Sequence, residues 1–446
     1  MQMLTGRVAA AVRRGGPTWV AGAIAAGPAT MAALVTAGAT AGYQLMWVVF
    51  ASAALGATTQ WLATRLGLVT GAGIIETVDA RLGAHWGWMT VMMTVVAAGL
   101  AQLVIMKTLA DISVTIVGGP AWAWALTWAV VLALGLGGGG YRIAEAAAKL
   151  LLAMVVLAFL LSVLVVPIDV GAVLAGSRPR PPSDIATLVS IAGILGGAVH
   201  ITLITMQTYT VQARGWTSAD LQLARWDTAT AMLGGFGLYS AAIYLVAATV
   251  LPAAGLTEVT AISAAVALGP LVGPAAESLF LLGLLGAAVT TLGGNTIVAP
   301  LLVADKLGWD PSIQDGRYRA MVVGVALLSA VGAVIEGAVL PLLVVVLAFG
   351  LLGTPFIIAV LLVLGTDVEL MGAHRLGGGA IAVGAVAMVV TGVSAGGFVW
   401  SRVMQGGSGA IDTMVLIMAL VMAVSTVAIV ARGLGWSGPR VVLQQG

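Results

Sequence analysis

The chain has no cysteine and very little charge. Because none of its 446 residues is a cysteine, disulfides, iron–sulfur clusters and thiolate metal sites are excluded. Charged residues make up only 8% of the chain, whereas 60% of its residues are hydrophobic. A soluble domain of this length carries far more charge, so the composition indicates a polytopic membrane protein in contact with a lipid bilayer. The formal net charge of +2 gives no reason to expect a nucleic-acid partner.

The apolar runs are long and continuous, without the short alternating segments of a membrane barrel, so the predicted fold class is all-α. Runs of roughly 20 residues, the length that crosses a bilayer, occur about twelve times. We expect membrane-spanning helices near 17–41, 43–67, 87–117, 121–138, 142–166, 186–213, 226–252, 275–302, 318–335, 338–364, 378–400 and 412–431.

Lysine and arginine gather in alternate loops, which predicts a multi-pass cell-membrane protein with both termini in the cytoplasm. The longest outer loop, Pro167–Asp184, contains R-P-R-P-P and is expected to be a stiff linker. This loop divides the first ten spans into two groups of five. We therefore expect one transporter domain made of two inverted repeats, about 15–166 and about 186–364, with extra helices at about 378–431.

Two of the spans are interrupted in corresponding positions of the two groups. The segment Ala21–Ala32 contains Gly27-Pro28, and Ser190–Trp216 contains Gly196-Gly197 followed by His200. Proline within a helix frees backbone groups, which in lipid must face protein, water or a ligand. A simple proline kink and a neutral imidazole bonded to a neighbouring helix are the structural alternatives. Two matching interruptions favour a substrate site of a transporter.

The residues at and after these breaks are the candidate site. We expect substrate to be bound by Gly27, Pro28, Thr30, Gly197, His200, Thr202 and Gln207. Candidates for the pathway or for coupling are Gln60, Gln102, Thr205 and Asn295. The stripe containing Thr205 has packing as an equally weighted alternative, because threonine hydroxyls satisfy carbonyls of their own helix.

Three other features are interpreted more simply. Lys107 and Asp111 have i,i+4 spacing and are expected to form a structural ion pair rather than an ion relay. Arg225 and Asp227 lie at an inner helix start, where charged residues serve as interfacial anchors. No metal-binding His/Glu cluster, phosphate loop or nucleophile–base pair is visible, so we expect neither an enzyme nor a cofactor or resident metal.

Several segments in order along the chain resemble a known transporter family. They are Gly42–Phe50 (G-Y-Q-L-M-W-V-V-F), Gln60–Gly71, Tyr141–Glu145 (Y-R-I-A-E), Val211–Arg214, Arg225–Asp227, Leu284–Thr296 and Gly365–Gly372 (G-T-D-V-E-L-M-G). Together they resemble the Nramp proton-coupled divalent-metal transporters over most of residues 15–375. The resemblance implies a leucine-transporter-like fold, in which two inverted five-helix repeats have unwound first and sixth helices.

The metal-site motif of this family is not retained. The resemblance places the Asp-Pro-Gly-Asn motif of the first helix on Gly27, Pro28, Ala29 and Thr30. On the sixth helix it places the methionine ligand on His200, the following proline on Ile201 and two histidines on Thr202 and Gln207. The acidic pair linked to proton movement falls on Gly99 and Gln102. The replacement of the aspartate and of the acidic pair removes negative charge.

A dehydrated divalent cation needs anionic oxygens or several good nitrogen or sulfur donors. Our first hypothesis is therefore an alternating-access transporter for a small polar or anionic non-metal solute. The alternative within the class is a divergent Mg²⁺ or Mn²⁺ transporter with weak or no proton coupling. A non-transporting membrane sensor is the third hypothesis, for which a signalling domain or a long cytosolic tail would be expected.

Overall fold

A computed structural model describes residues 16–138, 141–182, 184–406 and 409–435. Every regular element in these ranges is helical. Ten helical segments of the described chain are long and apolar enough to cross a membrane, and Ala121–Gly137 is a shorter apolar helix. The two termini lie outside the described residues, as does residue 15, where we expected the first repeat to begin. The all-helical membrane architecture predicted from the sequence is confirmed.

The first half of the chain supplies five spans. They are formed by α2 (Pro17–Ala25) with α3 (Pro28–Ala41), α4 (Met46–Thr70), α6 (Ala84–Val117), α7 (Ala121–Gly138) and α8 (Tyr141–Val165). A short helix, α5 (Ile74–Leu82), joins α4 to α6. The expected stiff linker contains a further helix, α9 (Val170–Gly176), which the Asp169 carboxylate caps by accepting from Ala172 N.

The second half repeats this organisation and adds two helices. Its spans are formed by α10 (Ile185–Val199) with α11 (Ile201–Ala213); α12 (Leu221–Ala229), a π-helix (Thr230–Phe236) and α13 (Gly237–Ala253); α16 (Ala276–Thr296) with α17 (Val298–Leu307); α18 (Gly316–Leu328); and α19 (Val339–Leu351) with α20 (Thr354–Thr366). The short helices are α14 (Ala261–Ala264), α15 (Gly269–Val272) and α21 (Val368–Met371). The added helices are α22 (Gly378–Met404) and α23 (Ala410–Gly435).

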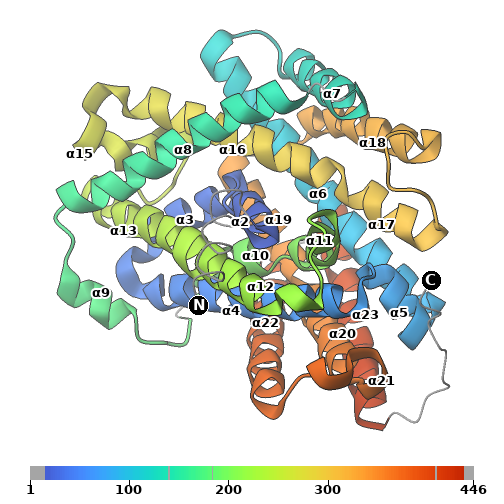
Figure 1. Ribbon diagram of the computed structural model, residues 1–446. Coiled ribbons are helices and arrows are strands. Elements are labelled where there is room, and N and C mark those ends of the chain that lie inside the picture. The colour runs from blue at the N-terminus through green and yellow to red at the C-terminus, as the bar shows by residue number, and fades with distance from the viewer. Residues whose placement is uncertain (1–15, 139–140, 183, 407–408, 436–446) are drawn as a thin grey trace, which may run out of the picture.

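The broken spans form the centre of the bundle. In Figure 1, α2, α3, α10 and α19 lie together in the middle of the ribbon, and α10 and α19 pack against each other and against α3. Within the described chain, 94% of the apolar window in Val339–Thr366 and 83% of that in Ile185–Ala213 are buried. The corresponding values are only 28% for Gly378–Met404 and 22% for Asp412–Gly435. The two C-terminal helices are therefore peripheral.

Small residues allow the central helices to approach closely. A Cβ on Gly38 of α3 would lie 2.8 Å from the amide nitrogen of Ala248 in α13. A Cβ on Gly286 of α16 would lie 2.6 Å from the carbonyl oxygen of Ala148 in α8. Because helices in lipid gain stability from such close packing, the many glycines of the chain act here as contact surfaces.

Four of the described spans are interrupted, two more than the sequence analysis predicts. The first interruption separates α2 from α3 at Ala26–Gly27, and the second separates α10 from α11 at His200. This break lies within the expected segment Gly196–Thr202, but Gly196 and Gly197 are inside α10, where a Cβ on Gly196 would collide with the carbonyl of Leu347 in α19. The unpredicted breaks separate α16 from α17 at Ile297 and α19 from α20 at Leu352–Gly353.

Candidate functional site

The first two helix breaks meet at one cavity of about 140 Å³. This volume accommodates several water molecules or a small organic solute. All the residues predicted to bind substrate line the cavity, namely Gly27, Pro28, Thr30, Gly197, His200, Thr202 and Gln207. The structure brings these residues together, and their role in binding remains a prediction.

The first break exposes the end of α2 and the start of α3. Pro28 opens α3, which suits it because its fixed φ is helical and its missing N–H would have no partner there. Two carbonyls at the break already have side-chain partners. The Thr30 hydroxyl donates to Ala25 O at 2.5 Å, and the Tyr239 hydroxyl donates to Ala26 O at 3.1 Å. These carbonyls therefore hold internal hydrogen bonds.

The second break is closed in a similar way by side chains. His200 leaves the helical conformation (φ −58°, ψ 134°), and α11 starts at the next residue. Its Nδ1 caps α11 by accepting from Thr202 N at 3.3 Å and contacts the Thr202 hydroxyl at 2.6 Å. The Val199 carbonyl accepts from the Thr354 hydroxyl at 2.6 Å. Thr354 lies at the break between α19 and α20. A side chain from that break therefore satisfies a backbone carbonyl freed at the second break.

The cap fixes the tautomer of His200. A backbone N–H is always a donor, so Nδ1 must be the unprotonated nitrogen, and the proton of the neutral ring is on Nε2. The Nε2 atom faces the backbone of α19 near Val346 and Gly350, where it has no hydrogen bond of ordinary geometry with any described residue. In this arrangement the only N–H donor of the His200 ring points at α19, and the ring presents no lone pair to the cavity.

Thr291 of α16 occupies the space beside Gly27. A Cβ on Gly27 would collide with the Thr291 hydroxyl and lie 3.0 Å from the Ile24 carbonyl. The Thr291 hydroxyl is buried and has no hydrogen-bond partner among the described residues. The sequence shows Thr291 only as part of a polar patch on its helix. Its position opposite Gly27 is a tertiary contact that spacing along the chain does not reveal.

The walls of the cavity are electrically neutral. Among the described residues that line it, none carries a carboxylate, and His200 is the only one with an ionisable side chain. The described chain contains no cluster of three His, Cys, Asp or Glu side chains with metal-binding geometry. Most of the surface that the cavity presents to a solute is apolar, and hydroxyls, amide side chains and one imidazole are set among its apolar side chains.

The pathway candidates differ in their positions. Asn295 lines the cavity and donates to Gln102 Oε1 at 3.0 Å, while Gln102 donates to the Thr296 hydroxyl at 2.7 Å. Asn295 and Gln102 both line a neighbouring cavity between α6, α16 and α18. The Thr205 hydroxyl donates to Ile201 O and Thr202 O of its own helix, which favours its packing alternative. Gln60 is buried away from the cavity, and neither of its amide atoms has a partner among the described residues.

Gln207 joins the cavity to a polar network beneath it. Its Nε2 donates to the hydroxyls of Thr18 in α2 at 3.0 Å and Thr64 in α4 at 2.8 Å. The Thr18 hydroxyl also lies 3.1 Å from the Thr228 hydroxyl of α12. The sequence analysis did not single out Thr18, Thr64 or Thr228, because isolated threonines in apolar helices give no signal of their own.

Asp227 is not the interfacial anchor that we expected. Its carboxylate is only 6% exposed and accepts from Thr18 N at 2.9 Å, at the start of α2. An anionic group is favourable there because the N-terminus of a helix carries partial positive charge. Lys107 and Asp111 form the expected structural pair, with Nζ and Oδ2 2.9 Å apart.

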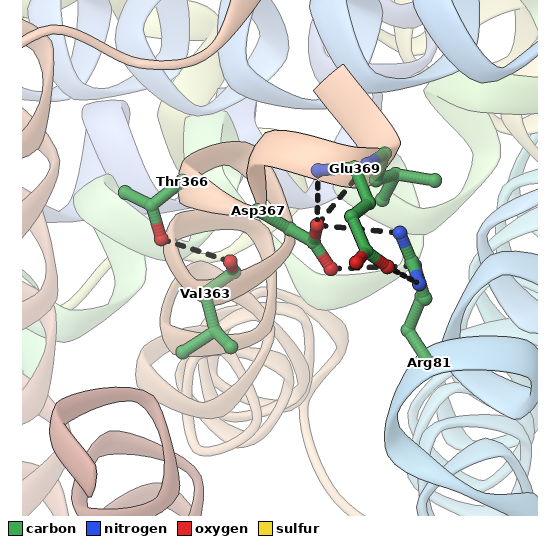
Figure 2. A network of polar contacts seen from close by, with 6 residues as sticks. Arg81, Val363, Thr366, Asp367 and Glu369 are labelled. Atoms are coloured by element: carbon green, nitrogen blue, oxygen red, sulfur yellow. Dashed lines mark hydrogen bonds and ion pairs between the residues drawn. The ribbon is translucent and has the colours of Figure 1, made fainter. Parts of the chain in front are cut away.

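Ion pairs tie α5 to the ends of later spans. Figure 2 shows Arg81 of α5 directed at Asp367 and Glu369, and its guanidinium lies 3.3 Å and 3.2 Å from their carboxylates. Lys306 of α17 pairs with Asp79 at 2.6 Å, and the Tyr209 hydroxyl donates to Asp305 at 2.5 Å. Burial and the nearby charge of Asp305 raise the pKa of the Glu76 carboxyl. These contacts hold the ends of the two five-span groups together on one side of the bundle.

Known transporters share this arrangement. The manganese transporter of Eremococcus coleocola, in a crystal structure of a mutant, superimposes with a TM-score of 0.75 at 14% identity, covering 94% of this chain and 93% of that one. Mhp1, a nucleobase-cation-symport-1 family transporter in a closed conformation, superimposes with a TM-score of 0.55 at 16% identity and the same coverage. At these identities the similarity shows the fold, and it confirms the predicted leucine-transporter-like arrangement.

Curated relatives match at the sequence level. The "Divalent metal cation transporter MntH" of Mycobacterium tuberculosis is 28% identical over 372 residues, which is 80% of this chain and 84% of the relative. The protein of the same name from Aeromonas hydrophila is 28% identical over 373 residues, covering 81% and 88%. The family described as natural resistance-associated macrophage protein-like matches residues 18–401. This chain therefore belongs to the Nramp family of membrane transporters.

Proposed function

We propose that this Nramp-family transporter carries a small polar solute with hydrogen-bond acceptor groups, bound in the cavity between the two helix breaks. The observation behind this proposal is the chemistry of the cavity wall. Between its apolar side chains it offers hydrogen-bond donors, while three carbonyls near the breaks, those of Ala25, Ala26 and Val199, already accept from Thr30, Tyr239 and Thr354.

A bare divalent metal is poorly matched to this wall. Taking a charge out of water costs many kcal/mol unless opposite charge or strong ligands replace the water. No carboxylate lines the described cavity. For His200 to bind a metal through Nε2, the ring proton would have to move to Nδ1, toward the Thr202 N–H that now caps α11. Binding would therefore disrupt the helix start that positions the residue.

The same wall suits a carbonyl or carboxylate. The helix α3 has no side-chain cap at Gly27, so the amides of its first turn have no side-chain acceptor, and they carry the positive end of the helix dipole. Half-helix ends of this kind receive anionic substrate groups in transporters. The His200 ring lines the same cavity with its Nε2–H directed at α19, and binding would require the ring to turn this donor toward the solute. A solute with one or two acceptor groups would then satisfy both.

A route into the cavity follows from the position of α2. This helix is separated from α3 by the break at Ala26–Gly27, and it borders the cavity through Ala21, Ile24 and Ala25. Its other side, through Trp19, Gly22 and Ala23, borders a second, mainly apolar cavity of about 580 Å³. Space on both sides of a short, disconnected helix supports alternating access by displacement of α2.

Divalent metal transport is the second candidate. The observation that favours it is the 28% identity over 80% of the chain to a protein named as a divalent metal cation transporter. A partly hydrated ion would lose less hydration energy in this neutral cavity than a bare one. Proton coupling would be weak, because Gly99 and Gln102 stand where the family resemblance places the acidic pair linked to proton movement.

Titration calorimetry on the purified protein distinguishes the two candidates. The titrants are Mn²⁺, Mg²⁺ and a panel of small solutes such as urea, glycine, acetate and lactate. We expect heat of binding from a member of the solute panel and none from either metal at millimolar concentration. Saturable Mn²⁺ binding in the micromolar range would overturn the first candidate in favour of the second.

Loss of the His200 donor is expected to weaken binding of an anionic solute by about 10- to 100-fold. This range corresponds to the roughly 1.5–3 kcal/mol of a hydrogen bond to a charged group. His200→Asn is the informative variant, because asparagine also caps helices and should preserve the start of α11. Calorimetry compares it with His200→Ala, which loses both cap and donor. Unchanged affinity in His200→Asn would remove His200 from the binding site.

We also propose that the termini are cytoplasmic and that the loop 167–184 is external, from the distribution of Lys and Arg alone. The native chain has no cysteine, so the thiol of a single Arg180→Cys variant can be labelled without a signal from other thiols of the protein. We expect an impermeant maleimide to label it on intact cells. A cysteine at the exposed Gln314, in the opposite set of loops, should react only after permeabilisation. The reverse pattern would invert the orientation.

A further inference from the structure

Gln207 belongs both to the cavity wall and to the contacts that hold α2 in place. We propose that Gln207 and Asp227 form a latch that keeps α2 closed beneath the cavity, with Gln207 as the positioning residue through which a bound solute weakens the latch. The coupling to solute rests on the function proposed above, whereas the latch itself does not.

Asp227 holds the first turn of α2. Its carboxylate is buried and accepts from Thr18 N at 2.9 Å, and the charge of Arg214 acts on the same carboxylate. The close approach requires glycine at position 16, where a Cβ would collide with the carboxylate. An anionic group bonded to the N-terminus of a helix is favourable, so this contact restrains the first turn of α2.

Gln207 ties the same turn to two further helices. Both hydrogens of its Nε2 are used, one on the hydroxyl of Thr18 and one on that of Thr64. Its Oε1 lies 3.2 Å from the Thr210 hydroxyl, which fixes the orientation of the amide. Together with the Thr18–Thr228 contact, these bonds join α2, α4, α11 and α12 at one buried point.

The remainder of α2 packs through Trp19, Ile24 and several small apolar residues, and the Ala26 carbonyl at its end accepts from the Tyr239 hydroxyl. Its cavity-facing side presents Ala21, Ile24 and Ala25, and its other side presents Gly22 and Ala23 to the second cavity. Small side chains bury little area and give little resistance to sliding. The polar contacts at Thr18 therefore hold the helix, and their loss would allow α2 to move into the second cavity.

A solute acceptor within reach of the Gln207 amide would compete with the latch. Since both Nε2 hydrogens are already used, the amide can bond a solute only by releasing Thr18 or Thr64. The latch would therefore hold α2 less firmly when the cavity is occupied than when it is empty. A solute without an acceptor would fill the cavity and leave α2 in place.

Cysteine accessibility measures the latch without any solute. A single Ala21→Cys, on the cavity side of α2 and 5% exposed, is combined with Asp227→Asn or Gln207→Leu. A small methanethiosulfonate reagent is then added to the purified protein. We expect either latch variant to raise the modification rate about tenfold, as loss of one charged or two neutral hydrogen bonds predicts. Gln207→Asn, which retains a shorter amide, should give an intermediate rate.

Ala387→Cys on α22 is the matched control, because this residue is fully buried and does not line the cavity. Its rate should not change in the latch variants. Equal increases at both cysteines would mean general loosening, and no increase at Ala21→Cys would mean that the contacts do not hold α2. Either result overturns the latch.

The coupling is then tested with the panel solutes. A solute that calorimetry shows to bind should raise the modification rate of Ala21→Cys in the otherwise unaltered protein. The same solute should leave that rate unchanged when Gln207→Leu is also present. An equal response in both proteins would overturn the role of Gln207. If no panel solute binds, the proposed cargo fails while the solute-free measurements still decide the latch.

Discussion

The double variant Gly27→Asp/Thr291→Ala is expected to bind Mn²⁺ at least about 100-fold more tightly than the unaltered chain, a difference of about 2.7 kcal/mol. The first substitution places a carboxylate at the break between α2 and α3, and the second removes the hydroxyl that now occupies that space. A carboxylate oxygen is a ligand that Mn²⁺ and Mg²⁺ prefer, and in a buried site its charge offsets the loss of water. Calorimetry with Mn²⁺ gives the affinity directly.

The matched control is Gly27→Asn/Thr291→Ala, which has the same shape without the charge. It should bind Mn²⁺ no better than the unaltered chain. Gly27→Asp alone should fold poorly, because forcing a side chain against Thr291 costs about 1–3 kcal/mol of packing strain. Equal Mn²⁺ affinities for the Asp and Asn double variants would show that position 27 does not face the binding cavity.

Oxidation of a Thr18→Cys/Thr228→Cys variant is expected to stop transport almost completely, and a reductant should restore it. The two hydroxyl oxygens lie 3.1 Å apart, so sulfur atoms at these positions are close enough to bond with small adjustments. A disulfide here joins α2 covalently to α12 and prevents the displacement that alternating access requires. Uptake into proteoliposomes of a panel solute that binds the unaltered protein provides the measurement.

Each single cysteine variant serves as a control, because it loses the same hydroxyl without the possibility of a cross-link. Both should transport equally in oxidising and reducing buffer. If the cross-linked protein transports at the rate of its reduced form, α2 does not move during the cycle and the route into the cavity lies elsewhere.

The helical spans were predictable because each is a long apolar run bounded by charged or glycine-rich loops. The break between α19 and α20 was missed because the run from Val339 to Leu352 is uniformly apolar, although Gly353-Thr354-Pro355 follows it. The first break was found because Gly27-Pro28 is a local signal. The second lies at His200, within the predicted segment Gly196–Thr202, while the glycines of that segment serve the packing of α10 against α19.

The cavity-lining residues could be listed from the sequence, but their partners could not. Thr18 and Asp227 are separated by 209 positions along the chain. In the sequence, Asp227 lies near a helix start and is followed by a polar residue, a pattern typical of a surface charge. The collision between Gly27 and Thr291 likewise depends on how α16 crosses the first break. Such contacts are decided by the packing of helices, and no periodicity along one helix reports them.

The neutral cavity wall determines how the membrane voltage acts on transport. Because no described residue of the wall carries a carboxylate, reorientation of the empty site moves no wall charge through the electric field. A neutral solute would then be insensitive to voltage and would equilibrate across the membrane. A univalent anion would gain about 2.3 kcal/mol per 100 mV when it leaves a cell that is negative inside, which corresponds to an accumulation ratio of about 50. Uncoupled transport through this cavity would therefore expel anions from a polarised cell.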